Sequence, residues 1–424
     1  MHYLADEFTE IVRTPKGKNI FAFTPAVCVL DSGRYVFTGD LGGEDVPSLP
    51  DYPSISPSPY SGAVRYGHIY TSDDRGETWQ RRAVRNFTHA RPFACGNTVY
   101  VLGHCGDLVI YRSDDGGDTW DDGSYLTQGE LWHQSACGYW VEDGIITLVM
   151  EQKIIHPDEH VDYWPVAFLA PVVMRAKLSD DLRRREVWTF SNRVRFVDLV
   201  DEDKLSYHGI PFYNTFRHRE RYPSEEYLTH AVGWLESNVV RITDPNHYWY
   251  DPSGRTYHIF MRANTAGTGY CALMRAVVGD DGAITVEPQT NPSGREVLFL
   301  PMPGGQNRFH ITWDAQTGLF WLLSVQSTDS MTRLEVMGEE RYHIPCDERD
   351  RLQLSFSRNC IDWCFAGLVA HGESPKQSRH YASMAIDGDD LVIVSRSGDA
   401  DTHSAHNTNL ATFHRIQNFR ALVY

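Results

Sequence analysis

The segment Ser72-Asp73-Asp74-Arg75-Gly76-Glu77-Thr78-Trp79 recurs 41 residues later as Ser113-Asp114-Asp115-Gly116-Gly117-Asp118-Thr119-Trp120. Each copy follows a short β-rich run, 67–71 in the first case and 107–112 in the second. The shared pattern S-x-D-x-G-x-T-W suits a hairpin turn. The Ser and Asp side chains bond backbone N–H groups, Gly adopts a conformation that other residues resist, and Trp packs beneath the turn. Two such copies predict a fold made of repeated β-sheet units.

Weaker versions of this pattern follow at 179–188, 279–282 and 357–363. These segments are Asp boxes, and through them the chain resembles the sialidase superfamily. Members of that superfamily fold as β-propellers and carry their Asp boxes on the periphery. The resemblance therefore implies a propeller, and it assigns the box residues to the fold and not to catalysis.

The boxes and the β-rich runs predict an all-β chain that folds as a six-bladed β-propeller, with four antiparallel strands in a blade. The expected blades are 25–84, 91–125, 132–188, 234–286, 308–363, and a sixth made of 381–386, 391–395 and 410–416. The N-terminal strand 10–13 is expected to complete the sixth blade, because an open ring would leave sheet edges exposed. Five or seven blades are the alternatives, since a long segment separates the third blade from the fourth. We expect a single domain, 1–424, with an inter-blade insertion at about 190–230.

The composition argues against several classes of function. The formal net charge is −17 and no block of Lys and Arg occurs, so we expect no nucleic-acid partner and no membrane partner. The N-terminus has no apolar signal segment, which predicts a cytoplasmic location, or a secreted or periplasmic one if a signal was trimmed. We expect no cofactor and no metal ion. The sequence leaves the oligomeric state open.

In a propeller, the residues that enter each innermost strand and those that leave each second strand meet at one end of the central axis, here called the mouth. Residues of the first kind include Phe23, Thr24, Arg91, His133, Glu236, Arg308, His310 and His380. Residues of the second kind include Asp40, His104, Glu151, Arg262, Asn264, Gln326 and Arg396. Buried charges are costly unless they pair or meet a ligand, so this set predicts either a polar binding site or a packed network of ion pairs.

The candidate catalytic residues are Glu236, Glu151 and His133. If the two glutamates face each other across the axis, they form the carboxylate pair that glycoside hydrolysis needs. The candidate substrate-binding residues are Arg262, Arg308, His310, Arg396, His406, Arg91, Asp40 and His104. Arginines around carboxylates and histidines suit a polyhydroxylated ligand that itself carries a carboxylate.

The sialidase resemblance implies further features of the site. Sialidases hold the carboxylate of their substrate with an arginine triad, of which one member lies in an Arg-Ile-Pro segment near the start of the first blade. The matching place here reads Phe23-Thr24-Pro25, and Arg91-Pro92 at the start of the second blade is a partial counterpart. The resemblance also implies a Tyr/Glu nucleophile pair and an Asp acid/base, for which Asp40 is the nearest candidate. The segments at 234–238, 303–305, 308–311, 395–396, 406–407 and 413–415 look like those of a bacterial group of sialidase-family proteins rather than of true sialidases.

Three functions fit these observations. The first is an exo-acting glycoside hydrolase that cleaves an acidic or uronate-containing oligo- or polysaccharide with Glu236 and Glu151. The second is a polysaccharide lyase, in which His133 or a tyrosine removes a proton next to a uronate carboxylate. The third is a non-catalytic carbohydrate-binding propeller, which is favoured if the two glutamates lie more than ~10 Å apart or are fully used in salt bridges.

Overall fold

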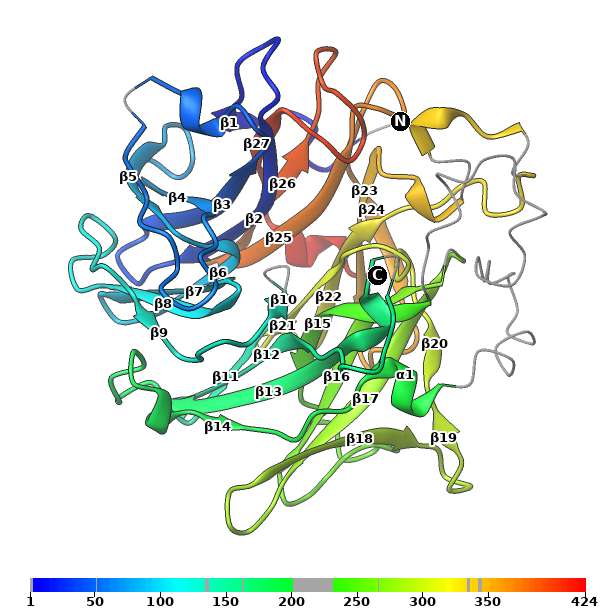
Figure 1. Cartoon of the computed structure of the whole chain (residues 1–424). Helices are drawn as coiled ribbons and strands as arrows, with labels where there is room; N and C mark the ends of the chain where they lie inside the picture. The colour runs from blue at the N-terminus through cyan, green and yellow to red at the C-terminus, as the bar shows by residue number, and fades with distance from the viewer. Residues whose placement is uncertain are drawn as a thin grey trace.

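The computed structural model shows six antiparallel sheets arranged as blades around a central axis (Figure 1). The structure describes residues 3–50, 52–133, 137–161, 164–200, 232–265, 267–333, 336–341 and 345–424. The fold is all-β and six-bladed, as the sequence predicts. Most of the expected insertion at about 190–230 lies outside the described residues, and the division into one domain stays a prediction.

Each blade is built on an antiparallel meander whose first strand lies nearest the axis, and the third and fourth blades each add one strand off this path. The first blade comprises β2 (Phe21–Val29), β3 (Tyr35–Gly42), β4 (Tyr66–Ser72) and β5 (Gln80–Arg85). The second comprises β6 (Thr88–Cys95), β7 (Thr98–Cys105), β8 (Asp107–Ser113) and β9 (Ser124–Tyr125). The third comprises β10 (Trp132–His133), β11 (Trp140–Glu142), β12 (Ile145–Lys153), β13 (Leu169–Lys177) and β14 (Thr189–Phe190). The fourth comprises β15 (Gly233–Val240), β16 (Thr256–Asn264), β17 (Tyr270–Val278), β18 (Ile284–Thr290), β19 (Glu296–Val297) and β20 (Phe299–Pro301). The fifth comprises β21 (His310–Asp314), β22 (Leu319–Val325), β23 (Arg351–Ser357) and β24 (Cys364–His371). The sixth blade comprises β25 (Arg379–Asp387), β26 (Asp390–Ser397), β27 (Leu410–Ile416) and β1 (Thr9–Arg13).

The short helices of the described residues lie between strands, except for the last one, which follows the final strand. They are α1 (Phe196–Leu199) and the 3-10 turns η1 (Val46–Ser48), η2 (Val166–Phe168), η3 (Arg185–Val187), η8 (Glu339–Arg341), η9 (Pro345–Asp347) and η10 (Phe419–Leu422). Within the described ranges, no helix is long and apolar enough to cross a membrane.

The second strand of each blade is buried along most of its length. In β22 every residue is buried, and in β26 all but the first residue are buried. These strands pack against neighbouring blades on both faces. Their sequences are therefore continuous apolar runs and do not alternate between apolar and polar residues. The largest core cluster joins side chains of three blades, such as Trp140, Trp234 and Phe320. Burying one side chain of this kind stabilises the fold by about 1.5–3 kcal/mol.

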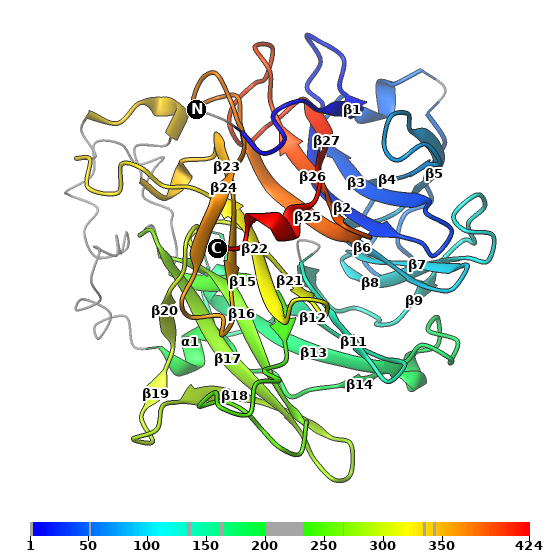
Figure 2. The same ribbon diagram turned by 180° about the vertical axis from the view of Figure 1, so that it is seen from behind.

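The N-terminal strand closes the ring. Strand β1 pairs with β27 and forms the fourth strand of the sixth blade, as predicted (Figure 2). Just before β1, the backbone N–H groups of Leu4 and Ala5 donate to Leu368 and Val369 of β24 in the fifth blade. The first residues of the chain therefore connect the last two blades.

The two best Asp boxes form the predicted turns between third and fourth strands. In the second box, Ser113 Oγ accepts from the N–H of Gly117, and Asp115 accepts from the N–H of Thr119 at 2.9 Å. The Trp120 indole donates back to the Gly117 carbonyl at 3.0 Å. Because third strands end away from the mouth, the boxes lie at the face opposite to it, which agrees with a structural role.

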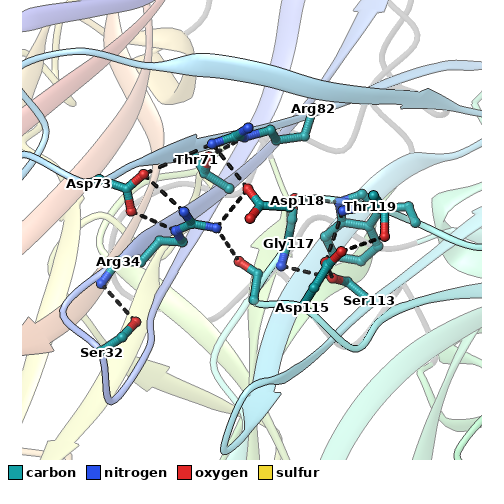
Figure 3. Close-up of polar contacts among 12 residues, drawn as sticks. Ser32, Arg34, Thr71, Asp73, Arg82, Ser113, Asp115, Gly117, Asp118 and Thr119 are labelled. Atoms are coloured by element: carbon teal, nitrogen blue, oxygen red, sulfur yellow. Dashed lines mark hydrogen bonds and ion pairs between the residues drawn. The ribbon is translucent and has the colours of Figure 1, made fainter.

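The boxes also join neighbouring blades. Arg34, on the hairpin between β2 and β3, donates to Asp73 of the first box and to Asp118 of the second (Figure 3). Arg82 of β5 also lies 3.1 Å from Asp118. One arginine thus connects the turns of two blades at the rim.

Candidate active site

Strand register brings the predicted polar residues to one level of the mouth. Antiparallel pairing places the start of each innermost strand beside the end of the second strand. The pairs at this level are Phe23–Asp40, Thr88–His104, His133–Glu151, Leu235–Arg262 and His380–Arg396. Five residues that the sequence places at the ends of second strands therefore lie at equivalent positions around the axis.

Four innermost strands carry a β-bulge at this level. The bulges contain residues with left-handed backbone: Thr24 (φ 35°), His89 (φ 50°), Glu236 (φ 62°) and Tyr381 (φ 48°). Non-glycine residues rarely adopt this conformation, which costs about 1–3 kcal/mol at each position. A bulge changes the direction of a side chain relative to the strand. The repetition of a costly conformation at one level of four blades marks this end of the axis as the candidate active site.

Tyr381 and Glu236, from the sixth and fourth blades, share a short hydrogen bond. The Tyr381 hydroxyl donates to Glu236 Oε1 at 2.5 Å, and Arg262 Nη1 donates to the Tyr381 oxygen at 2.8 Å. Arg262 Nη1 also lies 3.5 Å from Glu236 Oε1. Burial and the nearby Glu236 raise the pKa of Tyr381, so its phenol is neutral in the resting protein. Glu236 is positioned to accept the phenolic proton.

Arginine side chains surround the ring of Tyr381. Arg262 bonds its hydroxyl, and the Cζ atoms of Arg396, Arg349 and Arg308 lie 5.2, 5.8 and 5.9 Å from the ring centroid. Cations at these distances interact favourably with an aromatic ring. Together the four guanidinium groups make this part of the mouth locally cationic in a protein whose net charge is −17.

Arg396 differs from Arg349 in its partners. Arg349 donates to the Asp347 carboxylate at 2.6 Å. Arg396 donates to the backbone oxygen of His406, and its Nε has no hydrogen-bond partner among the described residues. The Cζ of Arg396 lies 4.2 Å from the ring centroid of Phe23. Burial lowers the pKa of Arg396, which means that its charge is incompletely compensated within the protein.

Asp40 is the buried carboxyl group of the first blade at this level. Its Oδ2 accepts from the Thr88 hydroxyl at 2.7 Å, and its Oδ1 accepts from the N–H of His89 at 3.3 Å. Burial raises the pKa of Asp40 to about 6, although the Thr88 hydrogen bond favours the charged form. A carboxyl group with this pKa can both give and take a proton near neutral pH.

Three histidines of the second and third blades contact one another, and the backbone of one of them, His89, bonds Asp40. His89 Nδ1 is 3.1 Å from His104 Nε2, and the rings of His89 and His133 are 4.9 Å apart. The indole of Trp164, 41% exposed, lies 6.2 Å from the His133 ring in an edge-on arrangement.

Glu151 of the third blade forms hydrogen bonds with the fourth blade. Its Oε1 accepts from the backbone N–H of Ser237 at 2.8 Å and from the Ser237 hydroxyl at 2.7 Å. Its Oε2 lies 3.5 Å from His133 Nδ1. The two candidate catalytic glutamates thus contact different partners: Glu236 bonds Tyr381, and Glu151 ties the third blade to the fourth.

The remaining predicted site residues are Arg91, His310, Arg308 and His406. Arg91 and His310 line a cavity of about 400 Å³ around the axis. Its lining also includes 26–31 and 383–386, where innermost strands run away from the mouth. His310 Nδ1 accepts from the N–H of Met384 at 2.9 Å. Arg308 donates to backbone oxygens of the sixth blade, and His406 packs its ring 5.9 Å from that of Phe23.

Sequence reasoning missed Tyr381, Arg349 and His89. Tyr381 and His89 lie in bulges, as do the predicted residues Thr24 and Glu236, and the sequence of a bulge does not show which residue at the start of a strand faces the axis. Arg349 precedes β23, the third strand of its blade. Third strands also begin at the mouth, and inspecting their first residues would have found it.

Fold and site together define a six-bladed β-propeller with a tyrosine–glutamate pair, a buried aspartic acid and several arginines at the mouth. No protein-family profile matches the chain, and no curated protein matches its sequence. Solved structures do match, and these structural neighbours are six-bladed propeller glycoside hydrolases.

Three of these neighbours illustrate the match. Trypanosoma rangeli sialidase in complex with sialic acid is 12% identical, with a TM-score of 0.53 over 98% of this chain and 59% of that chain. A Hadza microbial sialidase is 14% identical, with a TM-score of 0.51 over 95% of this chain and 66% of that one. The α-L-arabinofuranosidase of Fusarium graminearum in complex with arabinobiose is 11% identical, with a TM-score of 0.50 over 98% of both chains. At such identities the likeness shows the fold.

Proposed function

We propose that the protein is a sialidase-like, retaining glycoside hydrolase that removes a terminal acidic sugar from an oligo- or polysaccharide. Tyr381 is the nucleophile, Glu236 is its base, and Asp40 is the acid and then the base. The observation that carries this proposal is the 2.5 Å hydrogen bond from Tyr381 to Glu236 within a group of arginines. Glycoside hydrolases of known structure that share the fold support it.

In the first half-reaction, the Tyr381 oxygen attacks the anomeric carbon while its proton passes to Glu236. The bond from that carbon to the leaving oxygen breaks, and Asp40 gives its proton to that oxygen. Arg262, which donates to the Tyr381 oxygen at 2.8 Å, stabilises the negative charge that develops there. The product is a covalent sugar–tyrosine intermediate.

In the second half-reaction, water attacks the anomeric carbon from the side that the leaving group vacated. Asp40, now ionised, takes a proton from this water, and Glu236 returns its proton to the departing Tyr381 oxygen. Two displacements at one carbon retain its configuration. The pKa of about 6 at Asp40 suits a group that must work in both protonation states.

The arginines support an acidic substrate. Arg396 lacks a carboxylate partner among the described residues, so a substrate carboxylate would complete its hydrogen bonding. Phe23 stands where the sialidase resemblance implies an arginine, and Arg396 lies over its ring and supplies a cation beside that position. A neutral phenol as nucleophile also avoids the repulsion that a carboxylate nucleophile would exert on an anionic sugar.

The loop that follows β26 supports removal of a terminal sugar. Its residues His403 and His406 pack their rings 5.5 and 5.9 Å from those of Phe21 and Phe23. The backbone of His406 also accepts from Arg396. We expect this loop to limit the space on the arginine side of the site, where the rest of a polysaccharide would have to pass in an endo-acting enzyme.

The test is a panel of nitrophenyl glycosides of acidic sugars, both uronates and sialosides, followed by covalent trapping on the substrate that is cleaved. A fluorinated analogue of that sugar should label Tyr381, as found by peptide mass spectrometry. Tyr381→Phe and Glu236→Gln should each lower kcat by about 10²–10⁴-fold with an unchanged fold. Glu151→Gln is the control, and it should lower the unfolding temperature with a smaller effect on kcat.

Three outcomes contradict the proposal. Product with an unsaturated, ultraviolet-absorbing uronate would show a lyase. Saturable binding of acidic oligosaccharides with no turnover would show a binding propeller. Full activity of Tyr381→Phe would remove the nucleophile that we assign.

A further inference from the structure

The cavity around the propeller axis, called the axial cavity below, begins directly beneath the bulges of the mouth. Its volume is about 400 Å³, and segments of five blades line it. In β2, β6 and β25 the lining begins at Ala26, Arg91 and Ser383, where regular strand pairing resumes after each bulge. It continues to Asp31 and Gly96, which belong to hairpins at the face opposite the mouth. The cavity therefore extends from the level of the candidate active site toward the opposite face.

Arg91 is a buried cation in the lining of the axial cavity. Its side chain is 2% exposed, and its Nη2 donates to the carbonyl oxygen of Val149, on β12 of the third blade, at 3.0 Å. Among the described residues, its Nε and Nη1 have no hydrogen-bond partner. Burial lowers the pKa of Arg91 to about 10, so the guanidinium is still charged at neutral pH. A buried charge whose N–H groups are only partly bonded is costly unless a counterion meets it.

The acidic residues near Arg91 are engaged elsewhere or exposed. Glu151 offsets part of the effect of burial on the pKa of Arg91, but its carboxylate bonds the fourth blade. Its Oε1 accepts from the N–H and the hydroxyl of Ser237, and its Oε2 lies 3.5 Å from His133. Asp31 is exposed on the hairpin between β2 and β3, where water and salt screen its charge. Arg91 therefore has no direct carboxylate partner within the described part of the chain.

Two neutral side chains of the same lining are hydrogen-bond donors. His310 Nδ1 accepts from the N–H of Met384 at 2.9 Å, so the ring proton is on Nε2. Burial lowers the pKa of His310 well below its usual range, which keeps the ring neutral. The indole N–H of Trp140 is buried and has no hydrogen-bond partner among the described residues. One positive charge together with further N–H donors is the combination that binds an anion.

The surroundings of Arg91 favour an anion that is small and carries one charge. A monovalent anion balances the single guanidinium, whereas a divalent one would leave excess negative charge in a buried space close to Glu151. The two unpartnered nitrogens of Arg91 are themselves buried, so a large anion could not reach them.

We propose that the axial cavity binds a small monovalent anion, of the size of chloride or formate, at Arg91. The anion would stabilise the fold, because Arg91 of the second blade bonds the third blade through Val149. This site is separate from the proposed catalytic residues, and its existence does not depend on the reaction that they perform.

The experiment measures the unfolding temperature of the wild-type protein at constant ionic strength while chloride replaces a large sulfonate anion. Chloride should raise this temperature along a saturating curve by about 3 °C or more, because a ligand that binds only the folded state stabilises it. Formate should act in the same way. Arg91→Met, which keeps much of the side-chain volume, should lose at least about three quarters of the rise.

Arg379→Met is the matched control. Arg379 is another buried arginine whose Nε has no hydrogen-bond partner among the described residues, but it is not part of the cavity lining. Its loss should leave the effect of chloride unchanged. An equal chloride effect on the wild-type protein and on Arg91→Met would overturn the proposal.

Crystals of the wild-type protein grown with bromide give a direct measurement that is decisive even if Arg91→Met does not fold. An anomalous peak is expected within hydrogen-bonding distance of Arg91 Nε or Nη1. Absence of a peak there overturns the proposal. A peak only at arginines of the mouth, such as Arg396, also overturns it and assigns the chloride effect to the candidate active site.

Discussion

The side chains that define the candidate site belong to residues with unusual backbone. Glu236 and Tyr381 both have positive φ and sit at corresponding bulges of two blades. Their hydrogen bond joins two residues that are 145 positions apart in the chain. Bulges in a rigid sheet hold such groups in place better than flexible loops would, which favours the fixed geometry that covalent catalysis needs.

At the scale of residues, strand position predicted part of the site. Glu236, Arg262, Arg396 and Asp40 were expected at the mouth because each borders a buried apolar strand, and the register places them there. The partner of Glu236 could not be read from the sequence. Tyr381 follows His380 in an ordinary β-rich run, and its φ of 48° depends on the packed blade and not on local residue preference.

Asp40→Asn tests the pKa of about 6 that burial gives this carboxyl group. In the folded protein Asp40 keeps its proton up to about pH 6, and in the unfolded chain only up to about 3.8. The native state therefore binds more protons in this window, so wild-type stability falls as the pH rises from about 4 to about 6. Asparagine at this position cannot ionise and so removes this loss of stability, which is on the order of 3 kcal/mol.

We therefore expect Asp40→Asn to raise the unfolding temperature relative to wild type above about pH 6, with no difference near about pH 4. The same variant should lower kcat on the substrate that the wild-type protein cleaves about 10²–10⁴-fold. Wild-type kcat should decline above about pH 6 as Asp40 loses its proton. Thermal unfolding and rate profiles over this range measure both effects. Equal stability of the two proteins at all pH values would show that Asp40 is not a strained buried acid.

At the scale of elements, the Asp boxes explain why the fold could be predicted from the sequence. Their hydrogen bonds are local, so a few spaced residues suffice to specify the turn between two strands. The blades between them follow from long apolar runs such as Ile145–Met150 and Leu391–Val394. Bulges leave no comparable local signal, which is why the blade count was predictable and the direction of the mouth side chains was not.

Asp115→Ala should lower stability without affecting catalysis. Hydrogen bonds from Thr119 lower the pKa of Asp115 to about 2, so it is ionised and accepts from this turn throughout the neutral range. Loss of these bonds should reduce the free energy of unfolding by about 1–2 kcal/mol. Asp114→Ala is the control, because Asp114 makes an exposed ion pair with Arg112 and accepts an exposed hydrogen bond from the Thr98 hydroxyl at 3.3 Å, and neither partner lies within the turn of the box. Denaturant unfolding and kcat, measured on both variants, test whether the box has only a structural role. A large fall in kcat for Asp115→Ala would contradict that role.

At the scale of the whole molecule, the candidate site depends on the positive charge gathered at the mouth and on the blades being closed into a ring. The protein carries a net charge of −17, yet its mouth gathers Arg262, Arg308, Arg349 and Arg396 around one tyrosine. A cationic site within an acidic protein concentrates the field of those arginines at the mouth. The geometry of that site needs four blades to stay in register, because Glu236, Arg349, Tyr381 and Asp40 lie on the fourth, fifth, sixth and first blades.

The joint between the sixth and first blades is where the two ends of the propeller chain meet, and β1 closes it. Ile11 of β1 is buried in a cluster with Val27 and Phe37 of the first blade, and Leu4 and Ala5 bond the fifth blade. Without this segment, β27 would present an unpaired edge. A variant that lacks residues 1–13 should unfold at a temperature at least about 5 °C lower and form dimers or larger species.

Size-exclusion chromatography and thermal unfolding measure this loss, and the rate of the nitrophenyl substrate measures its effect on the site. Arg13→Ala is the control, since Arg13 makes only exposed ion pairs with Glu10 and Asp399 and should shift the unfolding temperature by no more than about 1–2 °C. We expect the shortened protein to lose activity in parallel with stability, because Tyr381 and Asp40 lie on the two blades that β1 helps to join. A monomeric variant with wild-type stability and rate would show that the ring holds together without its closing strand.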